Sequence, residues 1–147
     1  MTIEKVQQDI IEEFSVYEDW MDKYSYLIEL GNELADLPPE EKNDQNLIKG
    51  CQSRVWLVAE KNGGKIYFRG ESDAVIVKGL VALLLRVVSG RKPKEIIENE
   101  LHFIDDLGLK QHLSPTRSNG LLAMVKQIRL YAVAYDRMEK EGGTQNG

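Results

Sequence analysis

The chain has 147 residues, of which 42% are hydrophobic and 29% are charged, as in one ordinary globular domain. Its formal net charge of -5 at pH 7 argues against nucleic acid as the main ligand, because phosphate binding requires clustered Lys and Arg. The acidic opening segment is no secretion signal, and Lys78 and Arg86 interrupt the most apolar segment, so no membrane helix is expected. A single cysteine cannot form an intramolecular disulfide, and we expect a cytoplasmic protein.

Two amphipathic helices are predicted at the start of the chain. Apolar residues recur at helical spacing over residues 3–14 and again over 17–35. Pro38 and Pro39 then end the second helix, because paired prolines cannot continue it. The acidic, Asn-rich segment that follows is predicted to be a surface loop.

A β-hairpin is predicted after the cysteine. Residues 54–61 and 65–72 are rich in β-branched and aromatic residues, and the sequence NGG at 62–64 separates them. Asn62 and Gly63 supply the positive φ angles that a tight turn requires. The segment NLIK at 46–49 could add an edge strand, so the sheet is predicted to have two or three antiparallel strands.

A central helix and a long closing helix are predicted in the second half. The helix over 74–88 is apolar nearly all round, with Ser72 or Asp73 as its N-cap. Short helical pieces are expected over 94–108. Ser114 is predicted to cap the closing helix and Pro115 to be its first residue.

The element order lacks the alternation of strands and helices that builds a parallel sheet, so the predicted class is α+β. Residues 1–141 are predicted to form a single domain. The glycine-containing end, residues 142–147, is predicted to be a disordered tail.

Most common functional motifs are absent from the sequence. There is no glycine-rich phosphate loop, and the one cysteine and two histidines have no metal-ligand spacing. The paired carboxylates are adjacent in sequence and lie in charged segments, where a solvated surface is the simpler interpretation. We therefore expect neither a metal nor a cofactor.

Cys51 is the remaining candidate for chemistry. Unpaired cysteines are often buried and behave as small hydrophobes, so a structural role is the simpler interpretation. However, Cys51 follows a glycine and precedes Gln52 and Ser53, and Lys49 and Arg54 are expected to favour its nucleophilic thiolate.

Cysteine chemistries that need a second group find little support. The phosphatase loop C-x5-R is absent, because Leu57 stands at its last position. A cysteine hydrolase would need His112 as base with Asn119 or Asp136 as its orienting partner. A dithiol redox site needs a second cysteine. A lone thiol without a resolving partner suits a carrier that accepts a group and passes it on.

Four segments together resemble the SufE family. They are GCQSRVW (50–56), SDAVIVKGL (72–80), HLSPTRSNGL (112–121) and EDWMDKYSYLIELG (18–31), and the resemblance covers residues 17–135. It implies a fold shared with IscU-type scaffolds, with the cysteine on a loop at one end of a small antiparallel sheet. An IscU-type scaffold uses three cysteines, so cluster assembly on this chain is disfavoured.

The resemblance also implies a function. It implies a sulfur acceptor that stimulates a pyridoxal-phosphate-dependent cysteine desulfurase, takes its persulfide sulfur and delivers it to an iron–sulfur scaffold. Cys51 matches the persulfide-carrying cysteine of the family. Such a protein is a sulfurtransferase-type carrier rather than a stand-alone enzyme.

Several further residues are candidates for supporting or partner-binding roles. They are Gly50, Gln52, Ser53, Asp73, His112 and Arg117. Asp73 has the alternative role of a helix cap, and Arg117 is expected to have a specific acceptor, such as a buried carboxylate or the cysteine loop, because a helix N-terminus disfavours a cation.

Three questions stay open at this stage. A non-catalytic module that activates a desulfurase without carrying sulfur is the alternative function, and a homodimer is an alternative to a monomer. We also expect the loop to shelter Cys51 against apolar residues near Val55 or Leu121, and docking to expose it.

Overall fold

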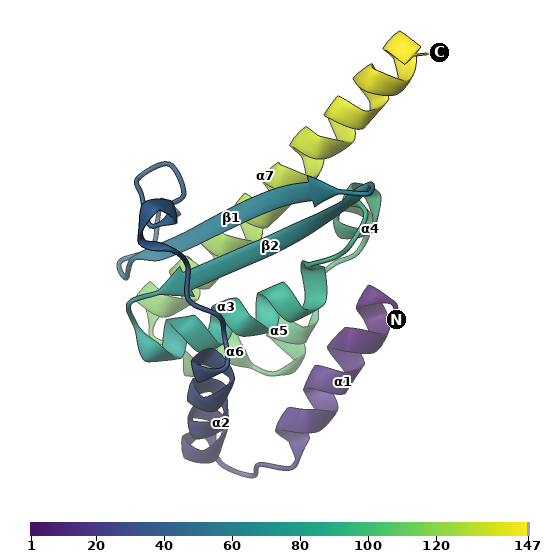
Figure 1. Cartoon of the computed structure of the whole chain (residues 1–147). Helices are drawn as coiled ribbons and strands as arrows, with labels where there is room; N and C mark the ends of the chain where they lie inside the picture. Colours follow the sequence, from purple (N-terminus) through teal and green to yellow (C-terminus); the bar gives the residue numbers. More distant parts are fainter. Residues whose placement is uncertain (147) are drawn as a thin grey trace.

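The computed structural model describes residues 1–146, without the side chains of residues 142–146. Over that part, seven α-helices surround a two-stranded antiparallel sheet, which confirms the α+β class (Figure 1). The elements in chain order are α1 Ile3–Ser15, α2 Trp20–Asn32, a 3-10 helix Pro39–Glu41, β1 Val55–Asn62, β2 Lys65–Ser72, α3 Val75–Val88, α4 Pro93–Glu98, α5 Phe103–Asp106, α6 Leu109–His112 and α7 Pro115–Asn146. Within the described residues, no helix combines the length and the apolarity needed to cross a membrane.

The hairpin differs from the prediction in its turn. β1 and β2 pair without a bulge until Asn62 lies opposite Lys65. Gly63 and Gly64 both have positive φ, so the two glycines form the turn. The predicted Asn-Gly turn was therefore wrong by one residue, because Asn62 belongs to the ladder. The segment 46–49 contributes one bridge, between Leu47 and Trp56, instead of a full third strand.

α3 is the centre of the core, as expected from its apolar sequence. It packs against β2 on one side and against α1 and α2 on the other. α2 and α3 cross at two glycines: a Cβ on Gly79 would lie 2.3 Å from the carbonyl oxygen of Leu27, and one on Gly31 would lie 2.7 Å from the Gly79 nitrogen. The absence of a side chain at Gly79 thus permits the close packing of these two helices.

The start of α7 follows the sequence signals. Pro115 is its first residue, and the Ser114 hydroxyl accepts a hydrogen bond from the Arg117 backbone N–H at 3.2 Å. α7 passes behind the sheet (Figure 1), where the Tyr135 hydroxyl donates to the Ala59 carbonyl at 3.2 Å. The predicted tail at 142–147 stays a prediction: α7 extends to Asn146, but Gly147 and the side chains before it lie outside the described residues.

Two other boundaries differ from the predicted ones. The second helix begins at Trp20 instead of residue 17, because the Asp19 carboxylate caps it by accepting from the Asp22 backbone N–H. The short helical pieces expected over 94–108 are α4, α5 and α6, and they continue to His112. They wrap the chain around the core between α3 and α7.

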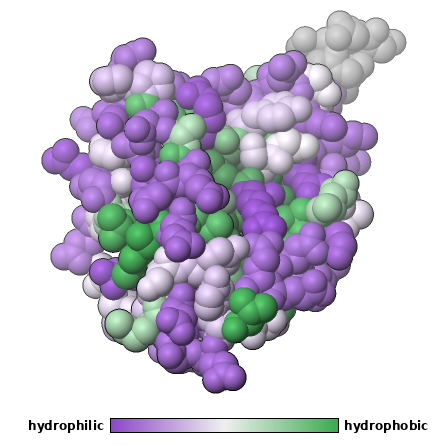
Figure 2. Space-filling model, turned by 60° about the horizontal axis from the view of Figure 1, so that its bottom comes forward, coloured by the Kyte–Doolittle hydropathy of each residue, from purple (hydrophilic) through white to green (hydrophobic). Residues whose placement is uncertain are grey.

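The surface is mixed in character. Hydrophilic residues dominate the face seen in Figure 2, and hydrophobic residues appear there in separate patches. Nine large hydrophobic side chains within the described residues are exposed, among them Val75 on α3 and Leu122 and Leu130 on α7. These three exposed apolar residues are on α3 and α7, the two helices that also border the cysteine loop.

Candidate functional site

Cys51 lies on a short loop between the Leu47 bridge and β1. A backbone hydrogen bond of 2.8 Å from Ile48 N–H to the Val55 carbonyl closes the base of this loop. Gly50, directly before the cysteine, has a φ of +92°, which favours glycine at that position. The sequence therefore folds this segment into a tight loop, with Cys51 near its tip.

The end of the loop is tied to the corner between β2 and α3. The Arg54 backbone N–H donates to an Asp73 carboxylate oxygen at 3.1 Å, and the Ser72 hydroxyl donates to the Arg54 carbonyl at 2.8 Å. The N-cap of α3 is Ala74, which makes no side-chain capping bond. The prediction that Ser72 or Asp73 is the N-cap was wrong: the Asp73 carboxylate holds the cysteine loop, and the Ser72 hydroxyl bonds that loop and accepts from the Ala74 N–H at 3.2 Å.

The Cys51 side chain is half-buried and points to the first turns of α7. Its thiol donates to the Gly120 carbonyl, with 3.5 Å between sulfur and oxygen. Burial raises the pKa of the Cys51 thiol above its ordinary value. The expectation that Lys49 and Arg54 would favour the thiolate is wrong for the free protein, because desolvation is what shifts this pKa.

A small hollow of about 20 Å³ lies beside Cys51. Its lining comes from the loop, from α3 and from the start of α7: Cys51, Gln52, Ser53, Val77, Thr116, Arg117, Gly120 and Met124. The expected shelter for Cys51 is present, but Val77 and Met124 supply its apolar walls instead of Val55 and Leu121.

Arg117 lies at the rim of this hollow, and its residue is exposed. Within the part of the chain that the structure describes, its guanidinium makes no ion pair or hydrogen bond, so the predicted buried carboxylate acceptor is not there. It lies beside the cysteine loop but makes no hydrogen bond to it, so the other predicted acceptor is not observed either. A cation without an internal partner beside a thiol is available to an incoming anion.

His112 belongs to a different environment. Its ring stacks on the Trp20 ring with 4.0 Å between the centroids, and its Nδ1 lies 3.0 Å from the Gly108 carbonyl oxygen. It does not line the hollow around Cys51. A hydrolase arrangement with His112 as general base therefore has no support from the geometry, since the base must reach the thiol.

Sequence reasoning missed Gly120 as a site residue. A Cβ built on Gly120 would lie 3.5 Å from the Cys51 sulfur, so the missing side chain leaves the space beside the thiol. A glycine inside a helix is unfavourable by about 1 kcal/mol relative to alanine. That local cost is the signal that could have marked this position.

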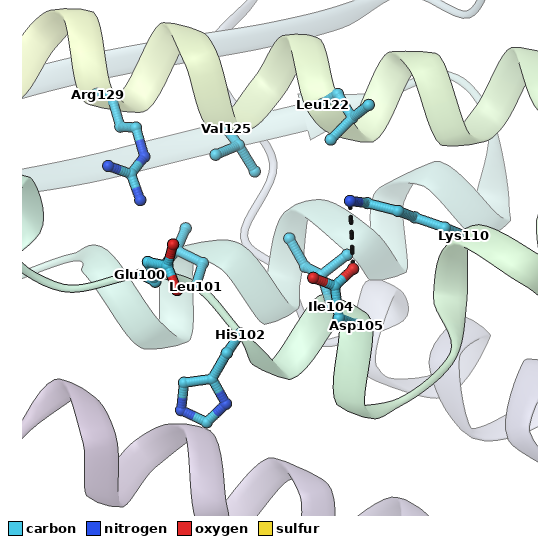
Figure 3. Close-up of a pocket in the computed structure, with 9 residues that line it drawn as sticks. All are labelled: Glu100, Leu101, His102, Ile104, Asp105, Lys110, Leu122, Val125 and Arg129. Carbon is cyan, nitrogen blue, oxygen red and sulfur yellow. Dashed lines mark ion pairs between the residues drawn. The ribbon is translucent and has the colours of Figure 1, made fainter.

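A second depression, of about 180 Å³, lies between α7 and the segment 100–110 (Figure 3). The Lys110 ammonium forms an ion pair with Asp105 at its edge, and Arg129 points toward it from α7, whereas the His102 ring turns away toward Glu4 of α1. None of the predicted site residues lines this depression. Among the described residues, no group of three or more His, Cys, Asp and Glu side chains is placed to hold a metal ion.

Comparison with known proteins places this geometry in context. The family model described as "SufE: Fe-S metabolism associated domain" matches residues 8–132. Among solved structures, the chain is similar to a hypothetical protein from Thermus thermophilus, with 21% identity, a TM-score of 0.71 and coverage of 88% of this chain and 94% of that chain. At this identity the likeness shows the fold alone.

Proposed function

Because the chain belongs to the SufE family, whose domain is associated with iron–sulfur metabolism, we propose that it is a sulfur acceptor that carries persulfide sulfur on Cys51. The donor is a pyridoxal-phosphate-dependent cysteine desulfurase, which the carrier also stimulates. The recipient is an iron–sulfur cluster scaffold. The observation that carries this proposal is the only thiol of the chain, held at a loop tip beside a small hollow with an exposed arginine at its rim.

The transfer is a thiol–persulfide exchange. The Cys51 thiol loses its proton, and the thiolate attacks the outer sulfur of the donor persulfide. The new bond joins the Cys51 sulfur to that outer sulfur, the sulfur–sulfur bond of the donor breaks, and the donor cysteine leaves as a thiolate that takes up a proton. Thiol and persulfide simply exchange places, so no external oxidant or reductant is consumed.

The residues around Cys51 have distinct proposed roles. Gly50 shapes the loop, and Asp73 positions its end through the Arg54 backbone. Arg117 interacts with the anionic persulfide or with the partner at the rim of the hollow. Gln52 and Ser53 contribute to the surface that contacts the partner. His112 has a structural role on Trp20, in place of the catalytic role considered from the sequence.

The test is a mass measurement on the protein and on its Cys51 peptide. After incubation with a cysteine desulfurase and cysteine, the peptide that contains Cys51 should gain one sulfur atom, and reduction with a thiol should remove it. Cys51→Ser should show no gain. A wild-type protein that stays unmodified under turnover would overturn the proposal.

The second candidate is a docking module that activates a desulfurase without carrying sulfur. The raised pKa of Cys51 in the free protein favours keeping this candidate in the test, because a protonated thiol is a poor nucleophile. A Cys51→Ser variant that stimulates desulfurase turnover as strongly as the wild type would support the docking module. Loss of stimulation in that variant would support the carrier.

A further inference from the structure

A groove of about 470 Å³ runs beside the cysteine loop. One wall is the segment 44–49, and the other is the exposed side of α7 from Ala123 to Tyr131. The groove reaches the cysteine loop, because Gly50 abuts α7: a Cβ on Gly50 would lie 3.4 Å from the Ala123 Cβ. A peptide bound along the groove would therefore reach the side of the cysteine loop.

Some backbone N–H and C=O groups at the groove have no hydrogen-bond partner among the described residues. Residues 46 and 48 pair with β1, through bonds of 2.9 Å from Leu57 N–H to the Asn46 carbonyl and 2.8 Å from Ile48 N–H to the Val55 carbonyl. On the outward edge of the same segment, the Leu47 carbonyl and the Lys49 N–H have no hydrogen-bond partner among the described residues. Such an edge can add an extended segment of another protein.

The side chains of the groove supply one apolar contact and a positive charge. Leu130 is 52% exposed on the α7 wall, and Tyr131 lies half-buried beside it. Lys49 and Lys126 stand on opposite walls, and within the described residues neither has a carboxylate partner. Asp44 is the one carboxylate in the lining.

This positive charge continues around Cys51. Arg117 lies at the rim of the hollow beside Cys51, and its guanidinium also makes no ion pair in the described part of the chain. The whole chain carries a net charge of -5, so a cluster of such cations at one face is a local reversal of its charge. An anionic partner is the complement of such a face.

We propose that this groove binds an extended, acidic segment of the sulfur donor and aligns it with Cys51. The inference rests on the proposed function and adds the docking surface and the chemistry of its partner. Carboxylates of the segment meet Lys49 and Lys126, one apolar side chain rests on Leu130, and the edge at Leu47 pairs with its backbone. The bound segment then brings the donor persulfide next to the cysteine loop.

The test is a charge-reversed double variant, Lys49→Glu with Lys126→Glu, compared with Lys94→Glu. Lys94 is an exposed lysine on α4 that makes no ion pair with the described residues, and it lies outside the groove. We measure the rate at which a cysteine desulfurase loads sulfur onto Cys51, over a range of carrier concentrations, and divide it by the rate of loading from cysteine persulfide. This ratio corrects for any change in the thiol itself.

For the double variant, we expect the concentration for half-maximal loading by the desulfurase to rise at least about tenfold at low salt. Lys94→Glu should shift it less than about twofold. Raising the salt concentration should weaken wild-type loading and have less effect on the double variant, because salt screens the attraction that the variant lacks.

Each other result has a defined meaning. A double variant that loads like the wild type overturns the groove while leaving the carrier function intact. Normal loading with impaired delivery to a scaffold also overturns it, since the groove then serves the recipient. A wild-type dimer that the double variant dissociates overturns it too, because the groove then belongs to a second copy of this chain. A wild type that accepts no sulfur from the desulfurase refutes the proposed function itself.

Discussion

At the scale of single residues, the site depends on a missing side chain. Gly120 is buried in α7, and its carbonyl oxygen accepts the hydrogen bond from the Cys51 thiol. The hollow beside the sulfur has a volume of about 20 Å³, which is room for about one small atom beyond the thiol. The outer sulfur of a persulfide would need this space, and a methyl group on residue 120 would take it.

Gly120→Ala should therefore raise the stability of the protein and slow its loading with sulfur. The added Cβ would lie 3.5 Å from the Cys51 sulfur, an ordinary contact, so the variant should fold and gain up to about 1 kcal/mol from its better helix propensity. Loading of sulfur should become slower. Chemical denaturation and the mass assay measure the two effects, with the exposed Asn119→Ala in the same turn as control. Unchanged loading would show that the persulfide lies elsewhere.

Cys51 should also react slowly with alkylating agents in the free protein. Its pKa is raised by burial, so at neutral pH the thiolate fraction is smaller than for an exposed cysteine. The rate of alkylation by iodoacetamide, followed over a pH range that spans the thiol titration, should rise with a midpoint above that of an unstructured peptide containing the sequence GCQSR. A midpoint below that of the peptide would mean that Lys49 and Arg54 stabilise the thiolate after all.

The residues of the site were predictable to different degrees. Cys51 stood out because it is the only thiol and follows a glycine, and both are properties of the local sequence. For Asp73 both a supporting role at the site and a helix cap were predicted, and the sequence could not decide between them, because the hydrogen bond to Arg54 joins residues 19 positions apart. The raised pKa of Cys51 was missed for a related reason: the burial that causes it comes from α3 and α7, which no local pattern reveals.

At the scale of elements, the contact between α2 and α3 sets the position of the site. α3 begins at the corner that anchors the cysteine loop, and its Val77 lines the hollow. The two helices approach so closely that backbone atoms of Leu27 occupy the place of a side chain on Gly79. The glycine therefore determines how deeply α3 seats between α2 and the sheet.

Gly79→Ala should destabilise the protein in spite of its favourable helix propensity. A Cβ at this position would lie 2.3 Å from the Leu27 carbonyl oxygen, so the helices must move apart. Overpacking of this kind costs about 1–3 kcal/mol or more in free energy of unfolding. Chemical denaturation measures the loss, and Ala82→Gly, on the same helix, gives the propensity effect in the opposite direction. An unchanged stability of Gly79→Ala would show that the crossing adjusts freely.

α1 is held in place by a histidine between two carboxylates. The His102 Nε2 lies 2.8 Å from a Glu4 oxygen of α1, and its Nδ1 lies 2.5 Å from an Asp106 oxygen of α5. These contacts raise the pKa of His102. The hydrogen bond with Asp106 contributes most, and the hydrogen bond with Glu4 comes next. Protonation thus strengthens the attachment of α1.

The stability of this attachment should depend on pH in a defined direction. A folded-state pKa above the unfolded value of about 6.5 means that the contribution is fully present below pH 6.5 and is lost as the pH rises through the folded pKa. Hydrogen exchange of the α1 amides should therefore accelerate above neutral pH, relative to α3. His102→Gln should remove this pH dependence, and a wild-type profile without a step would contradict the ionic character of the contact.

Some element boundaries are set by local turn and capping residues, and others by tertiary contacts. The hairpin and the start of α7 agree with the prediction to within a residue or two, because two glycines and a Ser-Pro pair fix the backbone there. The segment 46–49 forms a single bridge and not a strand, since the chain must turn away at Gly50 toward α7. Helix α6 could not be placed from sequence, because its four residues carry no periodicity.

At the scale of the whole molecule, the cysteine loop is anchored at both ends and weakly held between them. The sheet bond at Ile48 and the Asp73 bond at Arg54 fix its ends. Between residues 49 and 53, the contact of the Cys51 thiol with Gly120 is the one hydrogen bond that the described residues show. Opening of this loop would break few bonds of the core, as the proposed docking of a donor requires.

Binding of a desulfurase should change the loop and leave the core unaffected. We expect the amides of residues 46–54 to change their hydrogen-exchange rates when the enzyme is added, because Cys51 must leave its hollow to meet the donor sulfur. The amides of α3, which pack in the centre of the core, should not change. Asp73→Asn weakens one anchor and should raise the exchange of this loop in the free protein, while Asp44→Asn, on the groove wall, is the control. Exchange of residues 46–54 that is the same with and without the enzyme would mean that sulfur reaches Cys51 without opening of the loop.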